Sequence, residues 1–259
     1  MTRIMVAPNG ARKTKQDHPA LPVTDAEVIA TAVACHEAGA DAIHIHIRDE
    51  QQTHLLDSKR YQSIVTAIQE AARGLELQVT SEAAGIYDAE AQIELLNALR
   101  VPWVSVSIRE ILRANDRNHI PTFLTDLTKR CRVQFILYDV ADYEALTKLR
   151  AEGAIAGATF EVLYVLGRYA KNQMSDPTDL DPFLNFRAHL APEIAPSAEM
   201  VCAFGPSQIA CLVHAAHQGL DVRVGFENGF WLSNGRIADD NAALVSDIRS
   251  QLGDTEVSY

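Results

Sequence analysis

Residues 24–48 read TDAEVIATAVACHEAGADAIHIHIR and carry a helix signal followed directly by a strand signal. Thr24 has the character of an N-cap and Glu27 follows three positions later, which is the spacing of a capping box. Gly39 ends the helical pattern, so the sequence predicts a helix over 25–38. The alternating run after it predicts a buried strand. A helix that leads into such a strand is typical of one unit of a parallel sheet covered by helices.

The same alternation of signals continues along the chain. Strands are predicted at 3–7, 42–47, 75–80, 103–108, 132–138, 158–165, 200–204 and 222–226. Helices are predicted at 25–38, 58–72, 89–99, 121–129, 143–152, 180–189, 206–218 and 240–252. Eight such units without a Ser/Gly-rich linker favour a closed (β/α)8 TIM barrel, a fold of about 250 residues, in a single domain over 1–259. An open doubly wound sheet is the alternative, because helix 121–129 has a weak pattern.

Composition narrows the classes of function. Of the 259 residues 47% are hydrophobic and 22% are charged, which is typical of a globular protein rather than a disordered one. The formal charge of −11 argues against a nucleic-acid surface. No membrane span or signal peptide is predicted, and the four scattered cysteines are expected to be free thiols, as in a cytoplasmic protein. The basic stretch at Arg12, Lys13 and Lys15 is either an anion-binding segment or a solvated loop.

Two histidines in strand 42–47 point to a metal. His44 and His46 share a parity in an extended chain, so both imidazoles leave one face while the intervening isoleucines bury the other. Imidazole is a common zinc ligand, and a catalytic zinc usually has three protein ligands. Glu227, directly after strand 222–226, is the best third ligand, because the first strand of a closed barrel neighbours the last. The set also suits iron(II), and histidines hydrogen-bonded inside the barrel are the alternative.

Polar residues gather at the predicted strand ends, where the active sites of TIM barrels lie. The candidate substrate-binding residues among them are Asn9, Arg12, Ser107, Arg109 and Glu161. Each residue taken singly also fits a cap or turn role. Their accumulation indicates a binding site for a small molecule.

Three segments resemble the β-keto acid cleavage enzyme family: APNGARKTKQDHPALPVT at 7–24, EAGADAIHIHIRDE at 37–50, and VRVGFENGFWLSNGRIADDNAALV at 222–245. The resemblance implies a zinc-dependent TIM barrel that assembles as a homotetramer. It also implies that a β-keto acid condenses with acetyl-CoA to give acetoacetate and a new acyl-CoA.

The resemblance also implies roles for individual residues. His44, His46 and Glu227 match the family's metal ligands, and Arg223 matches an arginine beside the zinc. Thr80 or Ser81 matches a serine-threonine pair that hydrogen-bonds the substrate.

The sequence departs from the family pattern at three places. Asn228 stands where the family usually has an aspartate that serves as the base, and an amide cannot accept that proton. Glu82, where the family commonly has glycine, and Glu161 are the alternative bases. After the sixth strand VLGRYAK at 165–171 replaces a glycine-rich loop. The alternatives are therefore a carbon–carbon lyase or hydrolase that works without coenzyme A, and a noncatalytic metal- or ligand-binding relative.

Overall fold

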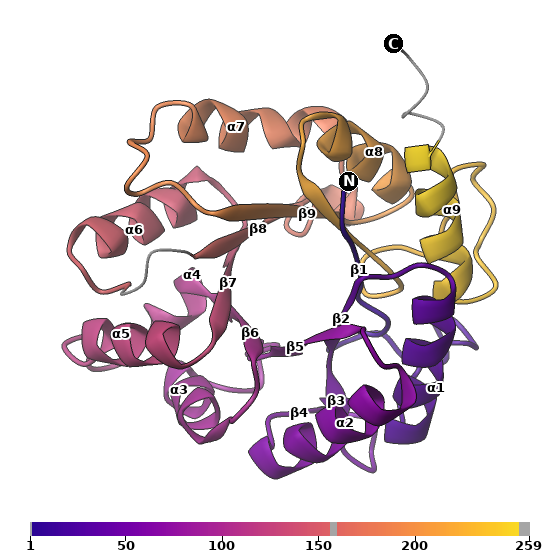
Figure 1. Cartoon of the computed structure of the whole chain (residues 1–259), viewed down its shortest axis with the longest axis horizontal. Helices are drawn as coiled ribbons and strands as arrows, with labels where there is room; N and C mark the ends of the chain where they lie inside the picture. Colours follow the sequence, from indigo (N-terminus) through magenta and orange to yellow (C-terminus); the bar gives the residue numbers. More distant parts are fainter. Residues whose placement is uncertain (1, 156–159, 254–259) are drawn as a thin grey trace.

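Eight parallel strands close into a barrel in the computed structural model, which describes residues 2–155 and 160–253 (Figure 1). Around the barrel the strands are β1 (Ile4–Val6), β10 (Asp221–Val224), β9 (Ala198–Ala203), β8 (Glu161–Leu166), β7 (Arg132–Leu137), β6 (Trp103–Ser107), β5 (Glu76–Thr80) and β2 (Ala42–Ile45). The barrel closes because β1 pairs with both β10 and β2. The predicted TIM barrel is confirmed.

Helices surround the barrel in the predicted order (Figure 1). They are α1 (Asp25–Glu37), α2 (Ser58–Ala71), α3 (Ala89–Ala98), α5 (Ile120–Arg130), α6 (Val140–Ala151), α7 (Asp181–Arg187), α8 (Gln208–His217) and α9 (Asn241–Gly253). The capping box of α1 is present, with both reciprocal hydrogen bonds between Thr24 and Glu27. Of the predicted strand 158–165, residues 158 and 159 lie outside the described residues. No helix in the described part of the chain is long and apolar enough to cross a membrane.

The predicted strand 42–47 is divided in the structure. β2 ends at Ile45, and a separate strand β3 (Ile47–Arg48) pairs in antiparallel fashion with β4 (His54–Leu55). The buried guanidinium of Arg48 donates hydrogen bonds to the carbonyls of Gly10, Lys13 and Gln52. These bonds hold the chain after His46 against the loop after β1. Three short elements were also not predicted: α4 (Ile108–Ile111) and the 3-10 helices η1 (Lys171–Gln173) and η2 (Pro177–Leu180).

Side chains of β2 alternate between two apolar clusters, as predicted from the sequence: one lies between the strands and the helices, and the other lies inside the barrel. Ile43 and Ile45 belong to the large cluster between strands and helices. The barrel interior holds a smaller cluster built from alternate strand residues, namely Met5, Ala42, Trp103, Ile136, Leu163, Val165, Met200, Cys202 and Phe204. His44 has the parity of Ala42, so its side chain enters the barrel interior rather than the helix layer.

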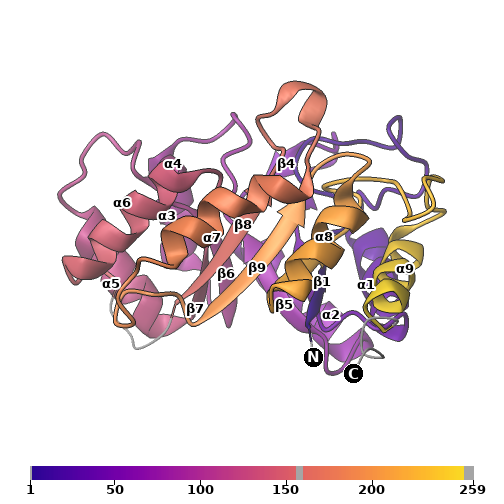
Figure 2. The ribbon, with the colours of Figure 1, turned by 90° about the horizontal axis from the view of Figure 1, so that it is seen from above.

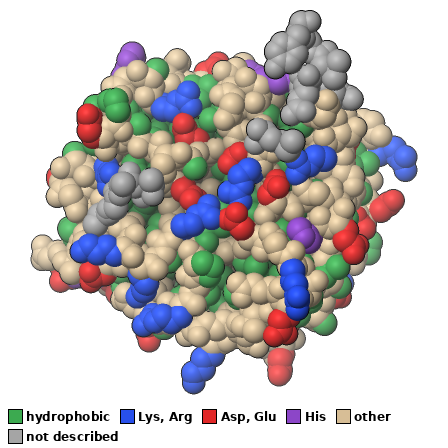
Figure 3. Space-filling view, in the orientation of Figure 1, with side chains coloured by type: hydrophobic (Ala, Val, Ile, Leu, Met, Phe, Trp, Pro, Cys, Tyr) green, Lys and Arg blue, Asp and Glu red, His purple; other side chains and the backbone are tan. Residues whose placement is uncertain are grey.

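The two ends of the barrel differ in character. Figure 2 shows β9 running from the end where the N-terminus lies toward the end that carries β4 and the segment after β8. The end where the N-terminus lies is the face seen in Figure 3, and acidic and basic side chains gather near the middle of that face. Arg132 pairs there with Glu76 and, at 2.9 Å, with Glu161. The sequence-based assignment of Glu161 to the substrate site is therefore corrected, since this carboxylate lies at the start of β8, at the opposite end of the barrel from the carboxyl ends of the strands.

Candidate metal centre

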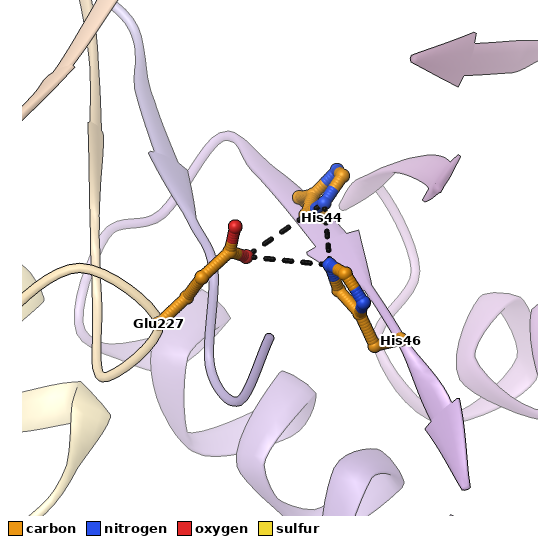
Figure 4. A group of neighbouring side chains, drawn as sticks. All are labelled: His44, His46 and Glu227. Atoms are coloured by element: carbon orange, nitrogen blue, oxygen red, sulfur yellow. Dashed lines mark hydrogen bonds and ion pairs between the residues drawn. The ribbon is translucent and has the colours of Figure 1, made fainter. Parts of the chain in front are cut away.

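His44, His46 and Glu227 converge at the carboxyl ends of the strands (Figure 4). The two histidine Nε2 atoms are 3.1 Å apart. Glu227 Oε2 lies 3.7 Å from Nε2 of His44 and 3.5 Å from Nε2 of His46. Two zinc bonds of about 2.0–2.1 Å at a tetrahedral angle place their ligand atoms roughly 3.3–3.4 Å apart. All three separations are close to that value, so the side chains already have the spacing that one ion requires.

A hydrogen bond from the neighbouring strand fixes the tautomer of His44. Nδ1 of His44 lies 2.7 Å from Oε1 of Gln78, which is its register partner on β5. An amide oxygen only accepts, so Nδ1 carries the proton and Nε2 keeps its lone pair for a ligand role. Gln78 is oriented in turn, because its amide nitrogen donates to Oε1 of Gln134 at 3.1 Å. The amide nitrogen of Gln134 lies 3.8 Å from the sulfur of Met200.

The electrostatics keep His44 and Glu227 in the form that binds a metal. Burial above all, together with the nearby charge of Arg223, lowers the pKa of His44 to about 3, so the ring is neutral at neutral pH. Burial by itself would raise the pKa of Glu227, but Arg223 above all holds that pKa well below its usual range. Arg223 Nη2 lies 3.1 Å from Glu227 Oε1. The other carboxylate oxygen, Oε2, is buried and has no hydrogen-bond partner among the described residues.

Close packing and side-chain hydrogen bonds between the loops after β1 and β10 position Glu227. Gly10 has φ +63°, and a Cβ added there would lie 2.6 Å from Cγ of Glu227. Only a residue without a side chain fits this turn beside the carboxylate. The amide of Asn241 accepts from the backbone N–H of Phe226 and donates to the carbonyl of Pro8, which joins the two loops. The amide of Asn9 donates to the carbonyl of His46 at 3.1 Å.

A cavity of about 280 Å³ opens beside the three ligands. The residues lining it are Asn9, Gly10, Ala11, Arg12, Lys13, His44, Thr80, Glu82, Ile136, Tyr138, Val165, Arg168, Gln173, Phe204, Arg223 and Glu227. The structure thus brings five of the sequence-derived candidates besides the metal ligands to one cavity: Asn9, Arg12, Thr80, Glu82 and Arg223.

Other candidates do not line this cavity. The hydroxyl of Ser81 donates to the carbonyl of Ser105, so Thr80 is the member of that pair that faces the cavity. Arg109 is held by Asp139 and Asp142 at 2.6 and 2.7 Å. Ser107 and Asn228 are buried behind the lining, at 3% and 2% exposure.

Sequence reasoning missed Gln78 and Gln134. Both are fully or almost fully buried, and each has an apolar residue on either side in its strand. A signal was present, since Gln78 has the parity of Thr80 and a lone amide in a buried strand needs a partner. The partner itself depends on the register between β2 and β5.

Replacing Gln78 with leucine is expected to weaken zinc binding about 10–100-fold, because the Nδ1 proton of His44 then loses its acceptor. Gln134→Leu keeps Gln78 as the acceptor and removes only the hydrogen bond that orients it, so we expect a smaller loss of zinc affinity. Competition with a chromogenic chelator measures both affinities. Equal affinity of Gln78→Leu and the unmodified protein would contradict the orienting role.

Comparison with known proteins locates the chain among enzymes. A model of the family described as beta-keto acid cleavage enzyme matches residues 2–257. A relative named 3-oxoadipate:acetyl-CoA acetyltransferase, from Cupriavidus necator, is 27% identical over 95% of this chain and 86% of its own length. A 3-keto-5-aminohexanoate cleavage enzyme from Fusobacterium nucleatum is 28% identical over 91% of this chain and 85% of its own.

Solved structures share the fold. ObcA, in a ternary complex with a C4-CoA adduct and oxalate, superposes with a TM-score of 0.73 at 16% identity. The match covers 92% of this chain and 65% of ObcA, so this chain spans about two thirds of that protein. A type I 3-dehydroquinate dehydratase from Clostridium difficile gives a TM-score of 0.64 at 10% identity over 100% of this chain and 93% of its own.

Proposed function

Since the chain belongs to the β-keto acid cleavage enzyme family, we propose that it is a zinc-dependent enzyme that condenses a β-keto acid with acetyl-CoA. The products are acetoacetate and a new acyl-CoA. The names of the relatives from Cupriavidus necator and Fusobacterium nucleatum support acetyl-CoA and a β-keto acid as substrates. The observation that carries the proposal is the convergence of His44, His46 and Glu227 beside a small cavity.

The donor set fits a divalent ion. Two imidazole nitrogens and one carboxylate form a common catalytic zinc site, although other divalent metals also accept it. The buried, unpartnered Oε2 of Glu227 and the fixed tautomer of His44 are features that a bound cation would use. When bound, the ion supplies a Lewis acid that polarises a carbonyl oxygen.

The reaction needs one proton to leave the keto acid and one to return. C2 of the acid loses a proton and bonds to the acetyl carbon as the coenzyme A thiolate leaves. The thiolate then adds to the C3 keto carbon, the C2–C3 bond breaks, and C2 takes up a proton. One carboxylate that accepts and returns a proton is therefore sufficient.

We assign that carboxylate to Glu82. It lines the cavity, and its Oε2 lies 3.9 Å from Nε2 of His46. Its other oxygen is 3.7 Å from Nη2 of Arg168, beyond hydrogen-bond distance. Glu161 lies at the other end of the barrel and Asn228 cannot take a proton, so neither competes for the role. We also propose that the hydroxyl of Thr80, which lines the cavity, hydrogen-bonds the bound acid.

Arg223 would stabilise the oxyanion that develops on the acid. It lines the cavity and is 3% exposed, and neither Nε nor Nη1 has a hydrogen-bond partner among the described residues, so both donors remain for a bound ligand. We expect Arg223→Met to lower kcat about 10²–10³-fold, the range for the loss of one oxyanion donor. Zinc content should be retained, because Arg223 is not a ligand. Unchanged kcat in a zinc-loaded variant would refute the assignment.

A substrate panel tests the proposed reaction. Purified, zinc-loaded protein is incubated with β-keto acids, with and without acetyl-CoA, and products are followed by mass spectrometry. Formation of acetoacetate and an acyl-CoA supports the proposal. Turnover that does not need acetyl-CoA indicates a lyase or hydrolase, and complete inertness indicates a noncatalytic relative.

We also propose a homotetramer that acts in the cytoplasm, as the resemblance to the family implies. Among the described residues, four large apolar side chains are exposed and available for contacts between copies: Ile86, Tyr169, Met174 and Ile237. All four cysteines are free, which suits a reducing compartment. Light scattering measures the assembly, and a mass of one or two chains would exclude the tetramer.

A further inference from the structure

The cavity is lined by more positively than negatively charged side chains. Among the described residues, the lining contains four basic side chains, Arg12, Lys13, Arg168 and Arg223, and two carboxylates. Arg223 and Glu227 pair with each other. Three basic side chains then face Glu82 alone, in a chain whose overall formal charge is −11. A concentration of positive charge against the sign of the whole molecule is typical of a site for an anion.

Lys13 has no counter-ion in the part of the chain that the structure describes. Its ammonium donates to the carbonyl of Phe226 at 2.7 Å and lies 4.4 Å from the centroid of the Phe230 ring. No carboxylate of the described residues forms an ion pair with it. Burial lowers the pKa of Lys13 to about 8, so the group is still mostly protonated at neutral pH. A half-buried ammonium without a carboxylate is a costly arrangement unless a ligand supplies the negative charge.

Arg168 is the second basic side chain of the cavity whose positive charge is only weakly balanced by a carboxylate. It follows Gly167 (φ +77°), where an added Cβ would lie 2.9 Å from the backbone nitrogen of Ser175, so the turn has no room for a side chain. Ser175 is bonded through its N–H and its hydroxyl to the carbonyl of Phe204, so this loop is tied to the end of β9. The guanidinium of Arg168 lies over the Phe204 ring at 5.2 Å, and its contact with Glu82 is loose.

Lys13 and Arg168 face the same space. Both line the cavity, and the charge of Arg168 lowers the pKa of Lys13, so the two cations repel each other across it. An anion between them would remove that repulsion. Ile136, Val165 and Phe204 give the cavity apolar walls that suit a short carbon chain.

We propose that the β-keto acid carries a second carboxylate, and that Lys13 and Arg168 bind it. This inference rests on the proposed function, because it names the class of acid that the same site takes. The phosphates of coenzyme A are the other source of negative charge, but they are separated from the thioester by the whole pantetheine arm. Lys13 and Arg168 share a cavity of about 280 Å³ with His44 and Glu227, which is the reach of a short diacid.

Matched pairs of acids test the inference. The zinc-loaded protein is given 3-oxohexanedioate or 3-oxohexanoate, which differ only in the terminal carboxylate. We expect kcat/KM to favour the diacid about 10–100-fold, the range for one or two charge-assisted hydrogen bonds. Lys13→Gln and Arg168→Gln should each reduce that preference about tenfold or more. Lys15→Gln is the control, since Lys15 lies in the same loop, pairs with Glu27 and does not line the cavity.

Two outcomes overturn the inference. One is a kcat/KM that is equal for the two acids or higher for 3-oxohexanoate. The other is an unchanged preference in Lys13→Gln and Arg168→Gln together with a raised KM for acetyl-CoA, which would assign both cations to the thioester.

Calorimetric titration with the unreactive pair adipate and hexanoate keeps the inference separate from the proposed reaction. Selective binding of adipate that is lost in both variants supports the second carboxylate even if no keto acid is turned over. Equal binding of the two acids rejects the inference even if the enzyme is active.

Discussion

Glu227→Ala is expected to release the metal and abolish acetyl transfer. Loss of a direct ligand should weaken zinc binding more than the about 10–100-fold that follows removal of an outer hydrogen-bond partner. The same change leaves Arg223, which is 3% exposed, without its carboxylate. Removing one partner of a buried ion pair costs about 3–5 kcal/mol of folding free energy. Metal analysis and denaturant unfolding measure the two effects separately.

Glu199→Ala provides the matched control for Glu227→Ala. Glu199 has a similar exposure, 15% against 13%, and pairs with Arg187 at 2.8 Å. It lies near the start of β9, away from the cavity. We expect both variants to lose stability and only Glu227→Ala to lose zinc. Full zinc content in Glu227→Ala would disprove its role as a ligand and with it the proposed centre.

Glu82→Gln is expected to lower kcat about 10²–10⁴-fold, the contribution of a general base. The amide keeps the size of the side chain but cannot take the proton from C2. Zinc affinity should change little, because Glu82 is not one of the three converging ligands. Steady-state kinetics on the zinc-loaded variant, with its metal content measured in parallel, gives the result.

Glu161→Gln is the control for Glu82→Gln. The sequence offered both residues as the base, and the two have similar exposures, 13% for Glu161 and 17% for Glu82. Glu161 pairs with Arg132 at the N-terminal end of the barrel, so its substitution should leave kcat near the unmodified value. A large loss in Glu161→Gln with normal kcat in Glu82→Gln would reverse the assignment.

The fold could be predicted because its signals are local and repeated. The capping box at Thr24, the stop at Gly39 and the alternating strand after it are read within one short segment, and seven more units follow the same rule. The split of the strand at His46 was not predictable, because it depends on Arg48 reaching carbonyls in the loop after β1.

The convergence of His44, His46 and Glu227 was predictable from parity and strand order, whereas the depth of a residue along the barrel was not. His44 and His46 share a parity, and β1 lies between β2 and β10 in the closed barrel. Glu161 was assigned to the wrong end because parity does not say where a strand begins, and β8 begins at Glu161. Gln78 was missed because the pairing of His44 with Gln78 is a matter of register between strands, which the sequence does not encode locally.

The amide behind His44 has a further consequence. Many zinc-bound histidines donate their second ring N–H to a carboxylate, whose charge makes the imidazole a stronger base. Gln78 orients the ring without contributing charge, and Gln134 behind it is equally neutral. The hydrogen bond therefore fixes the geometry of the His44 ligand without making its nitrogen more basic. We expect a bound ion to exchange readily for this reason. Which divalent metal resides in the protein inside a cell would follow the supply of free ions as much as intrinsic preference.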